Sequence, residues 1–173
     1  MGSGVSKTNA LPSRENSSHS KSYSSKKQGP TDRRVSVYFG SQTGTAEEFA
    51  RVVVSEALNS GFDAKLIDLE DYQPEKLKSC HLAVFLVATY GEGGPTDNAS
   101  RFLEWLENED GNIGGDYLSQ LDFCVFGLGN SQYENYNRMG RFVNEGLERL
   151  GGRRVFKYME GDDNGTLEED FES

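Results

Sequence analysis

Hydroxyl side chains and glycines alternate in the segment GSQTGTA, which begins at Gly40. An apolar run precedes this segment and a helical pattern follows it. Its main-chain N–H groups should therefore lie at a helix start, where an anion is favoured. Ser41, Thr43 and Thr45 add hydroxyl donors, and Gly44 allows the main chain to approach a ligand closely. This combination predicts a phosphate-binding loop.

The same loop contains no lysine. A loop that binds nucleoside triphosphates needs a Gly-Lys-Ser/Thr sequence to neutralise the β- and γ-phosphates and to hold a metal ion. The segment therefore argues against a nucleoside triphosphatase and favours one terminal phosphate, held by neutral donors. The alternative is an ordinary helix start, because Thr45 and Glu48 also fit the capping-box pattern.

A second polar loop, ATYGEGGPTDN, extends from Ala88 to Asn98 and follows the apolar run LAVFLVA. Three glycines surround Tyr90, so the main chain can turn sharply there and present the phenol ring to a flat ligand. The alternative is an aromatic residue at a strand end that packs on its own loop. Asn98 is expected to be the N-cap of a helix that runs through Trp105.

A third polar loop, GLGNSQYENYN, extends from Gly127 to Asn137. It begins like a dinucleotide-binding fingerprint, but Gln132 stands where the third glycine is required, and no acidic residue follows at the ribose-binding distance. The pattern therefore argues against a Rossmann-type site. What remains is a second aromatic residue, Tyr133, among side-chain amides that suit the donors and acceptors at the edge of a heterocycle.

Together the three loops describe one ligand. In an open parallel sheet, ligands bind beyond the carboxyl ends of the strands, where the strand order reverses, and all three loops are expected there. Two tyrosines from neighbouring loops and one phosphate-binding loop define a slot for a planar ring that carries a single phosphate. That is the outline of a flavin mononucleotide (FMN) site.

Apolar runs and helical periodicities alternate along residues 35–173. Runs rich in β-branched and aromatic residues predict strands, and apolar residues at i, i+3 and i+4 predict helices with one buried face. Gly61 should end the first helix. The expected strands cover residues 35–39, 64–68, 82–88, 123–126 and 155–158, and the expected helices cover residues 46–58, 99–106 and 139–150.

Such an alternation indicates an α/β protein with a parallel sheet covered by helices on both sides. Right-handed crossovers leave few topologies, and the five-stranded flavodoxin-like order 2-1-3-4-5 is the expected one. A last helix should start at Thr166, but only about two turns remain before Ser173. We therefore expect a three-layer flavodoxin-like fold whose last helix is truncated.

Charge divides the chain at about residue 34. Residues 1–34 carry seven Lys/Arg and two Asp/Glu, a balance of +5, and residues 35–173 carry eleven and twenty-six, a balance of −15. The first segment is rich in Ser and Lys and shows no apolar periodicity, which predicts a disordered basic tail before a single domain. The acidic domain argues against nucleic acid as a partner and favours a basic protein surface.

No apolar run approaches the roughly 18 residues of a membrane-spanning helix, and no signal-peptide core is present. Cys80 and Cys124 cannot form a disulfide framework, so a reducing, cytoplasmic compartment is expected. The first residues match the N-myristoylation pattern with Gly2 as acceptor, although a cloning remnant or an ordinary loose terminus fits as well. An acyl chain and the basic tail would together supply the two signals that membrane anchoring requires.

Four motifs make the chain similar to the diflavin reductases: GSQTGTAEEFA, ATYGEGGPTDNA, FGLGNSQYENYN and GDDNGTLEEDF. From about Val35 to its end, the chain resembles the FMN-binding, flavodoxin-like domain of the NADPH–cytochrome P-450 reductase type. The cofactor-binding residues that this resemblance implies are Ser41, Gln42, Thr43, Gly44, Thr45 and Ala46 for the phosphate, Ala88, Thr89, Tyr90 and Gly91 for one ring face, Leu128, Gly129, Asn130, Ser131, Gln132, Tyr133, Glu134, Asn135, Tyr136 and Asn137 for the other, and Asp163 near the flavin or its loop.

The resemblance also implies electron transfer. Such a domain accepts electrons from an FAD- and NADPH-binding module, which this chain does not contain, and passes them singly to a haem protein such as a cytochrome P-450 or cytochrome c. The full-length protein would lie at the cytosolic face of the endoplasmic reticulum. Gly91 matches the position where a peptide carbonyl can turn toward the flavin N5. Gly94 and Asn164 replace aspartates of the mammalian relatives, in acidic surface patches that concern docking more than flavin binding.

A group of acidic side chains is expected near the flavin edge, where it would steer a basic haem protein to the site. The group comprises Glu92, Asp97, Asp162, Asp163, Glu168, Glu169 and Asp170. The alternative is an ordinary solvated acidic surface. No catalytic side chain and no metal site are expected, because His19 and His81 have no matching Cys or Asp partner, and Cys124 belongs in the core.

Three other functions remain open from the sequence. The first is the FMN domain of another diflavin enzyme, such as the sulfite reductase flavoprotein, methionine synthase reductase or nitric oxide synthase, although the ending GDDNGTLEEDF favours the P-450 reductase type. The second is a freestanding flavodoxin-type electron shuttle. The third is a binding module that has lost its flavin, against which the presence of both Tyr90 and Tyr133 argues.

Overall fold

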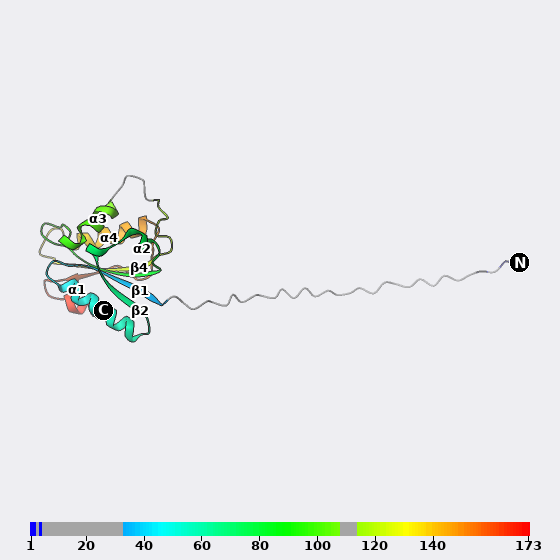
Figure 1. Ribbon diagram of the computed structural model, residues 1–173, viewed down its shortest axis with the longest axis horizontal. Coiled ribbons are helices and arrows are strands. Elements are labelled where there is room, and N and C mark those ends of the chain that lie inside the picture. The colour runs from blue at the N-terminus through cyan, green and yellow to red at the C-terminus, as the bar shows by residue number, and fades with distance from the viewer. Residues whose placement is uncertain (3, 5–32, 108–113) are drawn as a thin grey trace. The chain divides into compact units, whose positions relative to one another are not determined.

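A computed structural model describes residues 1, 2, 4, 33–107 and 114–173 of the chain (Figure 1). Its internal contacts separate residues 1–31 from a compact unit over residues 32–173. The disordered tail predicted for residues 1–34 lies almost entirely outside the described residues, so it stays a prediction, as does acylation at Gly2. None of the helices in the described ranges is long and apolar enough to cross a membrane.

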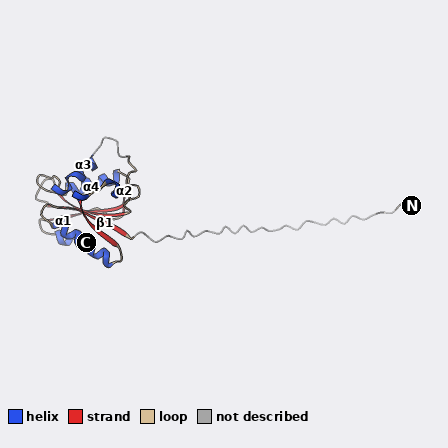
Figure 2. Cartoon of the chain, viewed as in Figure 1, coloured by secondary structure: helices blue, strands red, loops and turns tan. Residues whose placement is uncertain are grey.

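Strands and helices alternate along the described part of the compact unit, as the periodicity predicts (Figure 2). The strands are β1 (Arg34–Gly40), β2 (Asp63–Asp68), β3 (Leu82–Ala88), β4 (Asp122–Gly129), β5 (Arg153–Arg154) and β6 (Met159–Asp162). The α-helices are α1 (Thr45–Asn59), α2 (Pro74–Lys78), α3 (Ser100–Glu107), α4 (Arg138–Arg149) and α5 (Leu167–Glu172), and two short 3-10 helices are η1 (Leu69–Asp71) and η2 (Asp97–Ala99).

The strands form one parallel sheet in the order β2-β1-β3-β4-β5, and β6 also pairs with β4. The predicted flavodoxin-like order is therefore confirmed, with the fifth position shared by two short strands. In register, Gly40 lies beside Val87, and Ala88 lies beside Leu128. The central strands β1, β3 and β4 thus end close together, and the loops that follow them leave the same edge of the sheet.

Helices cover both faces of the sheet (Figure 1). Along β3, Phe85 and Val87 belong to the core cluster under α3 and α4, whereas Leu86 belongs to the cluster under α1 and α5. This alternation explains why LAVFLVA is apolar at every position, since a strand with helices on both faces buries both sets of side chains. The chain reaches α1 from β1 on one face and α3 from β3 on the other, so the connections change face between these neighbouring strands.

The sequence did not indicate the short helix α2. Gln73 is its N-cap, Pro74 occupies its first turn, and Leu77 is its one fully buried apolar side chain. Proline at the first helical position is a known start signal, but a single apolar residue carries no periodicity. A helix of this length therefore gives no 3.6-residue pattern from which it could have been predicted.

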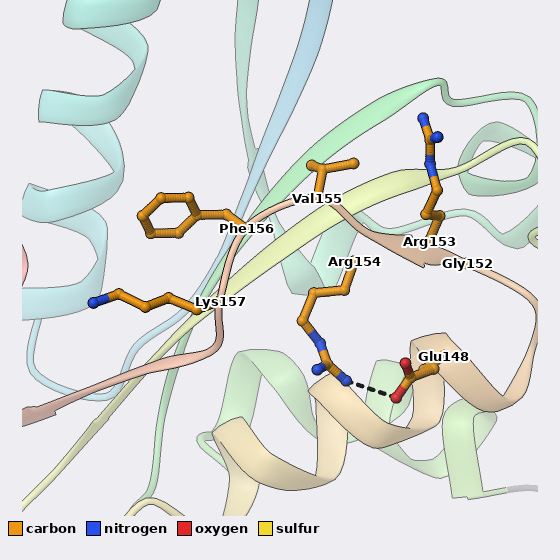
Figure 3. A pocket seen from close by; sticks show the side chains of 7 residues that line it. All are labelled: Glu148, Gly152, Arg153, Arg154, Val155, Phe156 and Lys157. Carbon is orange, nitrogen blue, oxygen red and sulfur yellow. Dashed lines mark hydrogen bonds and ion pairs between the residues drawn. The ribbon is translucent and has the colours of Figure 1, made fainter.

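The strand predicted over residues 155–158 is wrong. This segment is an irregular connection between β5 and β6 at the edge of the sheet, and the exposed fractions of Val155 and Phe156 are 47% and 54%. Figure 3 shows the surface hollow that the segment lines, with Arg154 turned toward Glu148 of α4 and Val155 on the opposite side of the chain. An apolar β-branched run indicates compatibility with a strand, but it cannot indicate how many neighbouring strands will pair with it.

Candidate functional site

The candidate site lies at the carboxyl ends of β1, β3 and β4. The polar segments that follow these strands converge on a cavity of about 580 Å³. This volume is within the range of about 300–1,000 Å³ that is usual for small-molecule sites. The position is the one expected for a ligand in an open α/β sheet, because the chain connections change face between β1 and β3.

Most of the predicted site residues line this cavity. They are Ser41, Gln42, Thr43, Thr45, Ala46, Ala88, Thr89, Tyr90, Gly91, Leu128, Gly129, Asn130, Tyr133, Asn135, Tyr136, Asn137 and Asp163. Four predicted residues, Gly44, Ser131, Gln132 and Glu134, do not line it. Three residues that were not predicted to bind the cofactor, Glu92, Gly93 and Leu167, do line it. Leu167 belongs to α5, and no local pattern could have assigned it to a site formed by distant loops.

The first loop forms the N-terminus of α1. Gly44 is the N-cap at a φ of 101°, a conformation that favours glycine, and its N–H donates a 3.0 Å hydrogen bond to Ser41 Oγ. The capping box of Thr45 and Glu48, which was the basis of the alternative interpretation, is not present, because Thr45 is already the first helical residue and no side chain caps the helix. The first N–H groups of a helix have no partner within the helix, so an anion in the cavity can accept hydrogen bonds from them.

The second loop is held as a tight turn. Tyr90 and Gly94 form an isolated antiparallel bridge, with N–H···O distances of 2.9 Å from Tyr90 to Gly94 and 2.8 Å from Gly94 to Tyr90. Gly91 and Gly93 lie inside this turn at φ values of 55° and 97°. The turn leaves the Tyr90 side chain 52% exposed beside the cavity. The structure therefore disfavours the alternative in which Tyr90 packs on its own loop.

Asn98 is not the N-cap that the sequence predicts. It lies in η2, before the first residue of α3, and its side chain binds residues of two other strand-end segments. Its Oδ1 accepts a 3.0 Å hydrogen bond from the N–H of Ser41, and its Nδ2 donates a 2.9 Å bond to Asp68. The N-cap pattern failed because it considers only neighbours in the sequence, and here the partners are 57 and 30 residues away.

The third loop presents Tyr133, whose side chain is 64% exposed at the cavity. Asn137 supports this loop from within: it is fully buried at a φ of 52°, and its Nδ2 donates a 3.1 Å hydrogen bond to the carbonyl oxygen of Gly161. Thr89 Oγ1 accepts a 3.1 Å bond from the N–H of Met139, which ties the start of α4 to the end of β3. Tyr90 and Tyr133 are thus two large exposed side chains on loops that hydrogen bonds hold in place.

Ser131 and Gln132 support the third loop from outside the cavity. The N–H of Ser131 donates a 2.9 Å bond to Asp162 Oδ1, and Gln132 Nε2 donates a 2.6 Å bond to Asn164 Oδ1. Hydrogen bonds from Ser131, and then from the N–H of Asn164, lower the pKa of the Asp162 carboxyl. These bonds join the loop after β4 to the turn after β6, so Ser131 and Gln132 hold the loop without lining the cavity.

Five of the seven acidic residues predicted to surround the site are exposed to solvent: Glu92, Asp97, Asp163, Glu168 and Glu169. Of these, Glu92 and Asp163 line the cavity itself. The carboxylates of Asp162 and Asp170 instead accept structural hydrogen bonds. Asp162 Oδ1 accepts the N–H groups of Ser131 and Asn164, and Asp170 Oδ2 accepts bonds from the N–H of Asp162 and from Thr166 Oγ1. The predicted group therefore consists of solvent-exposed carboxylates, of which Asp97 also accepts a hydrogen bond from Gln42, and of two less exposed carboxylates with a structural role.

The cavity has no cationic side chain that could neutralise a phosphate. None of the residues that line it is Lys or Arg, so main-chain N–H groups and hydroxyls are the donors available to an anion. Within residues 33–107 and 114–173, no three His, Cys, Asp or Glu side chains are grouped so that they could hold a metal ion. His81 lies at the opposite end of β3, and burial raises the pKa of the Cys124 thiol to about 11.

The donor set and the two tyrosines fit FMN. A cavity with a helix N-terminus and hydroxyls at one side suits a terminal phosphate, and exposed phenol rings on two separate loops suit the faces of a flat ring. Leu128, Ala88 and Ala46 add apolar surface to the lining. Sheet order, cavity position and donor set together define the class of flavodoxin-like domains.

The chain belongs to the flavodoxin family, whose model, described as "Flavodoxin", matches residues 37–173. It is 48% identical over 138 residues to NADPH–cytochrome P-450 reductase of Dictyostelium discoideum, a match that covers 79% of this chain and 20% of that protein. It is 47% identical over 146 residues to NADPH–cytochrome P-450 reductase of Homo sapiens, covering 82% of this chain and 21% of that protein. The resemblance predicted from the four motifs is therefore confirmed.

Solved structures support the fold. A cysteine-to-alanine mutant of flavodoxin from Pseudomonas aeruginosa superposes with a TM-score of 0.67 at 25% identity, covering 80% of this chain and 90% of that chain. Oxidised flavodoxin 2 from Bacillus cereus has the same TM-score at 23% identity and shows the fold alone. The chain spans about a fifth of the length of the reductases and most of the length of the flavodoxins.

Proposed function

We propose that this chain is the FMN-binding electron-transfer domain of an NADPH–haemoprotein reductase of the cytochrome P-450 reductase type. It would accept electrons from an FAD- and NADPH-binding module and pass them singly to a haem protein. The observation that carries the proposal is the cavity at the ends of β1, β3 and β4, which two exposed tyrosines line together with a helix-start loop without cationic side chains. The high identity to reductases across the same residues supports it.

The two tyrosines bind and orient the ring in this proposal. Tyr90 and Tyr133 come from different loops, and both line the cavity and expose more than half of their surface to solvent. Stacking on an aromatic ligand would remove this surface from water, and aromatic pairs contribute about 0.5–1.5 kcal/mol each beyond the buried area. Burial, and then the carboxylates of Asp162 and Glu160, raise the pKa of nearby Tyr136, so its hydroxyl remains protonated at neutral pH.

Bound FMN would supply the electron-transfer chemistry, and the protein supplies orientation and electrostatics. The neutral phosphate loop leaves the charge of the ligand uncompensated, and residues 35–173 carry a balance of −15. Glu92 and Asp163 bring part of this charge to the cavity itself. A negative potential disfavours the addition of negative charge to the ring, so these residues favour electron donation to an acceptor.

The exposed carboxylates at the site suit a basic haem protein. Glu92, Asp163, Glu168 and Glu169 are exposed around or next to the cavity. Such a field accelerates the encounter with a positively charged partner, and salt screens it over about 10 Å at 0.1 M ionic strength. We therefore propose a haem protein with a basic face as the acceptor, and the NADPH-binding module as the donor.

The first test is flavin binding by the purified chain. We expect it to carry, or to take up at micromolar concentrations, one FMN per chain, seen as flavin absorption and as quenching of FMN fluorescence on titration. Denaturation should release the FMN. A colourless protein that is well folded by circular dichroism and does not bind added FMN would overturn the proposal.

The second test is electron transfer from the reduced, FMN-loaded chain to cytochrome c. We expect the bimolecular rate to fall steeply as ionic strength increases, and the double variant Glu168→Gln/Glu169→Gln to weaken that dependence. The matched control is Glu104→Gln on α3, which removes one exposed carboxylate outside the acidic group. A rate that does not change with salt would count against an acidic docking surface while leaving flavin binding intact.

A freestanding electron shuttle is the second candidate function. The observation that favours it is the 90% of the Pseudomonas aeruginosa flavodoxin that the chain covers. The two candidates differ in their electron donor. A shuttle exchanges electrons with separate proteins, whereas a reductase domain receives them within one polypeptide, so the NADPH-dependent reduction of cytochrome c by the full-length gene product would identify the reductase.

A further inference from the structure

Three strand-end segments meet at the side chain of Asn98. Its Oδ1 accepts a 3.0 Å hydrogen bond from the N–H of Ser41, which follows β1, and a 2.7 Å bond from Thr96 Oγ1, within the segment after β3. Its Nδ2 donates a 2.9 Å bond to Asp68 Oδ1, at the end of β2. Asp68 Oδ1 also accepts a 2.8 Å bond from the N–H of Glu70 and caps η1. One amide thus connects the ends of three strands.

The packing around this amide leaves little room for adjustment. Thr96 is fully buried, and a Cβ at Gly40 would lie 2.9 Å from Ala99 Cβ and 3.2 Å from Thr96 Oγ1. A closely packed protein interior transmits a displacement to neighbouring groups instead of absorbing it. The position of η2 therefore determines where Asn98 Oδ1 lies, and Asn98 Oδ1 determines the direction of the Ser41 N–H.

A second pair of hydrogen bonds links the segment after β1 to the segment after β3. Gln42 Nε2 donates a 3.0 Å hydrogen bond to Asp97 Oδ2, and the N–H of Asp97 donates a 3.0 Å bond to Gln42 Oε1. Gln42 was predicted to hold the phosphate, but its side-chain amide is already occupied by Asp97. Ser41 Oγ likewise accepts the N–H of Gly44, so the one proton of its hydroxyl remains available to a ligand.

We propose that Asn98, which does not line the cavity, is the positioning residue of the phosphate loop. By holding the N–H of Ser41, Asn98 orients the Ser41 hydroxyl and the following N–H groups toward the terminal phosphate of the ligand. Asp97 adds to this through Gln42. This inference rests on the proposed function, and it concerns the phosphate end of the ligand, not the ring.

A comparison of FMN with riboflavin distinguishes effects at the phosphate from effects at the ring, because the two ligands differ only in the terminal phosphate. The experiment titrates the flavin-free form of the whole chain with each ligand and follows the quenching of flavin fluorescence. In Asn98→Ala, we expect the dissociation constant for FMN to rise by about tenfold, as for the loss of one or two hydrogen bonds. The dissociation constant for riboflavin should stay within about twofold of that of the unchanged chain.

A matched control is available in the same segment. Ser100 Oγ donates a 3.1 Å bond to the carbonyl oxygen of Thr96, and within the described residues no hydrogen bond between Ser100 and Ser41 is observed. Ser100→Ala therefore removes one hydrogen bond of η2 without removing the link to the phosphate loop, and its preference for FMN over riboflavin should remain unchanged. Thermal melting of each flavin-free variant reports whether it is folded.

Asp97→Ala provides a second variant if Asn98→Ala does not fold, because Asp97 is exposed and its removal leaves no buried cavity. In this variant the affinity for FMN should fall by a smaller factor than in Asn98→Ala, and the affinity for riboflavin should not fall. An unchanged chain that binds neither ligand would overturn the proposed function. The positioning role alone would be overturned if the unchanged chain prefers FMN and Asn98→Ala keeps this preference. Equal loss of affinity for both ligands in Asn98→Ala would overturn it as well.

Discussion

Asn135 Nδ2 donates a 2.8 Å hydrogen bond to the main-chain carbonyl oxygen of Glu92, across 43 residues of sequence. The bond joins the loop that presents Tyr90 to the loop that presents Tyr133. The next residue after Glu92 is Gly93, where a Cβ would lie 2.3 Å from Asn135 Cβ. Direct contact between the two loops therefore restrains the loops that carry Tyr90 and Tyr133 relative to each other.

The adjacent glycines of this turn should respond differently to substitution. Gly93 has a φ of 97°, and Gly93→Ala places a methyl group against Asn135. The substitution should push the two loops apart and weaken the binding of FMN and of riboflavin by similar factors, about tenfold or more. Gly94→Ala is the matched control, because its Cβ would meet only the carbonyl oxygen of Tyr90, at 3.7 Å. Fluorescence titration measures the flavin affinities of both variants. Equal affinities would contradict the close contact between Gly93 and Asn135.

Tyr133→Ala should reduce FMN affinity far more than Cys124→Ala. The first substitution removes an exposed ring at the cavity, and the second shortens a half-buried side chain within β4. Loss of one stacking face should raise the dissociation constant by about tenfold. Tyr133→Phe keeps the ring and should retain most of the affinity, so a large loss in that variant would assign the effect to the hydroxyl instead of to stacking.

The thiol of Cys124 should react slowly with iodoacetamide in the folded protein. Burial raises its pKa to about 11, so the thiolate fraction at pH 8 is on the order of one in a thousand. The rate should increase about tenfold for each unit of pH up to that pKa, provided that the fold persists. Peptide mass spectrometry can measure the modification, with the urea-unfolded chain as the fast reference. Rapid labelling of the native protein at pH 7 would show that the residue is accessible.

Asp162 should contribute to stability above its unfolded pKa and lose that contribution in acid. Its folded pKa lies below the ordinary value of 3.8, because it accepts hydrogen bonds from Ser131 and Asn164. The native state therefore binds the proton less readily than the unfolded state, and stability decreases as the pH falls from about 4 through the folded pKa. Asp162→Asn should be less stable than the unchanged chain at pH 7, and the difference should shrink below pH 4.

Urea unfolding curves at several pH values provide this comparison. Asp163→Asn is the neighbouring control, since that carboxylate is exposed and no hydrogen bond to its side chain is observed within the described residues. The free energy of unfolding of this control at pH 7 should lie close to that of the unchanged chain. A constant difference between Asp162→Asn and the unchanged chain from pH 7 to pH 3 would show that ionisation of Asp162 plays no part.

The sequence was sufficient to predict the sheet order, the helices on both faces, and the three loops that form the site. Each of these features is encoded locally: in the alternation of apolar runs, in Gly44 at a helix start, and in tyrosines next to glycines at strand ends. Periodicity reports which side chains must be buried, and in a parallel sheet this requirement leaves few topologies. The proposed FMN site is predictable because the ends of the central strands meet at one edge of the sheet.

The errors arose where distant neighbours decide the outcome. Asn98 fits the pattern of an N-cap, yet it binds Ser41 and Asp68, and Val155 fits the pattern of a strand, yet the sheet edge leaves it exposed. The bond between Asn135 and Glu92 likewise has no local signal. The partners of a polar side chain depend on which segments the fold brings together, so the sequence determined the parts of this site and tertiary structure decided how they are held.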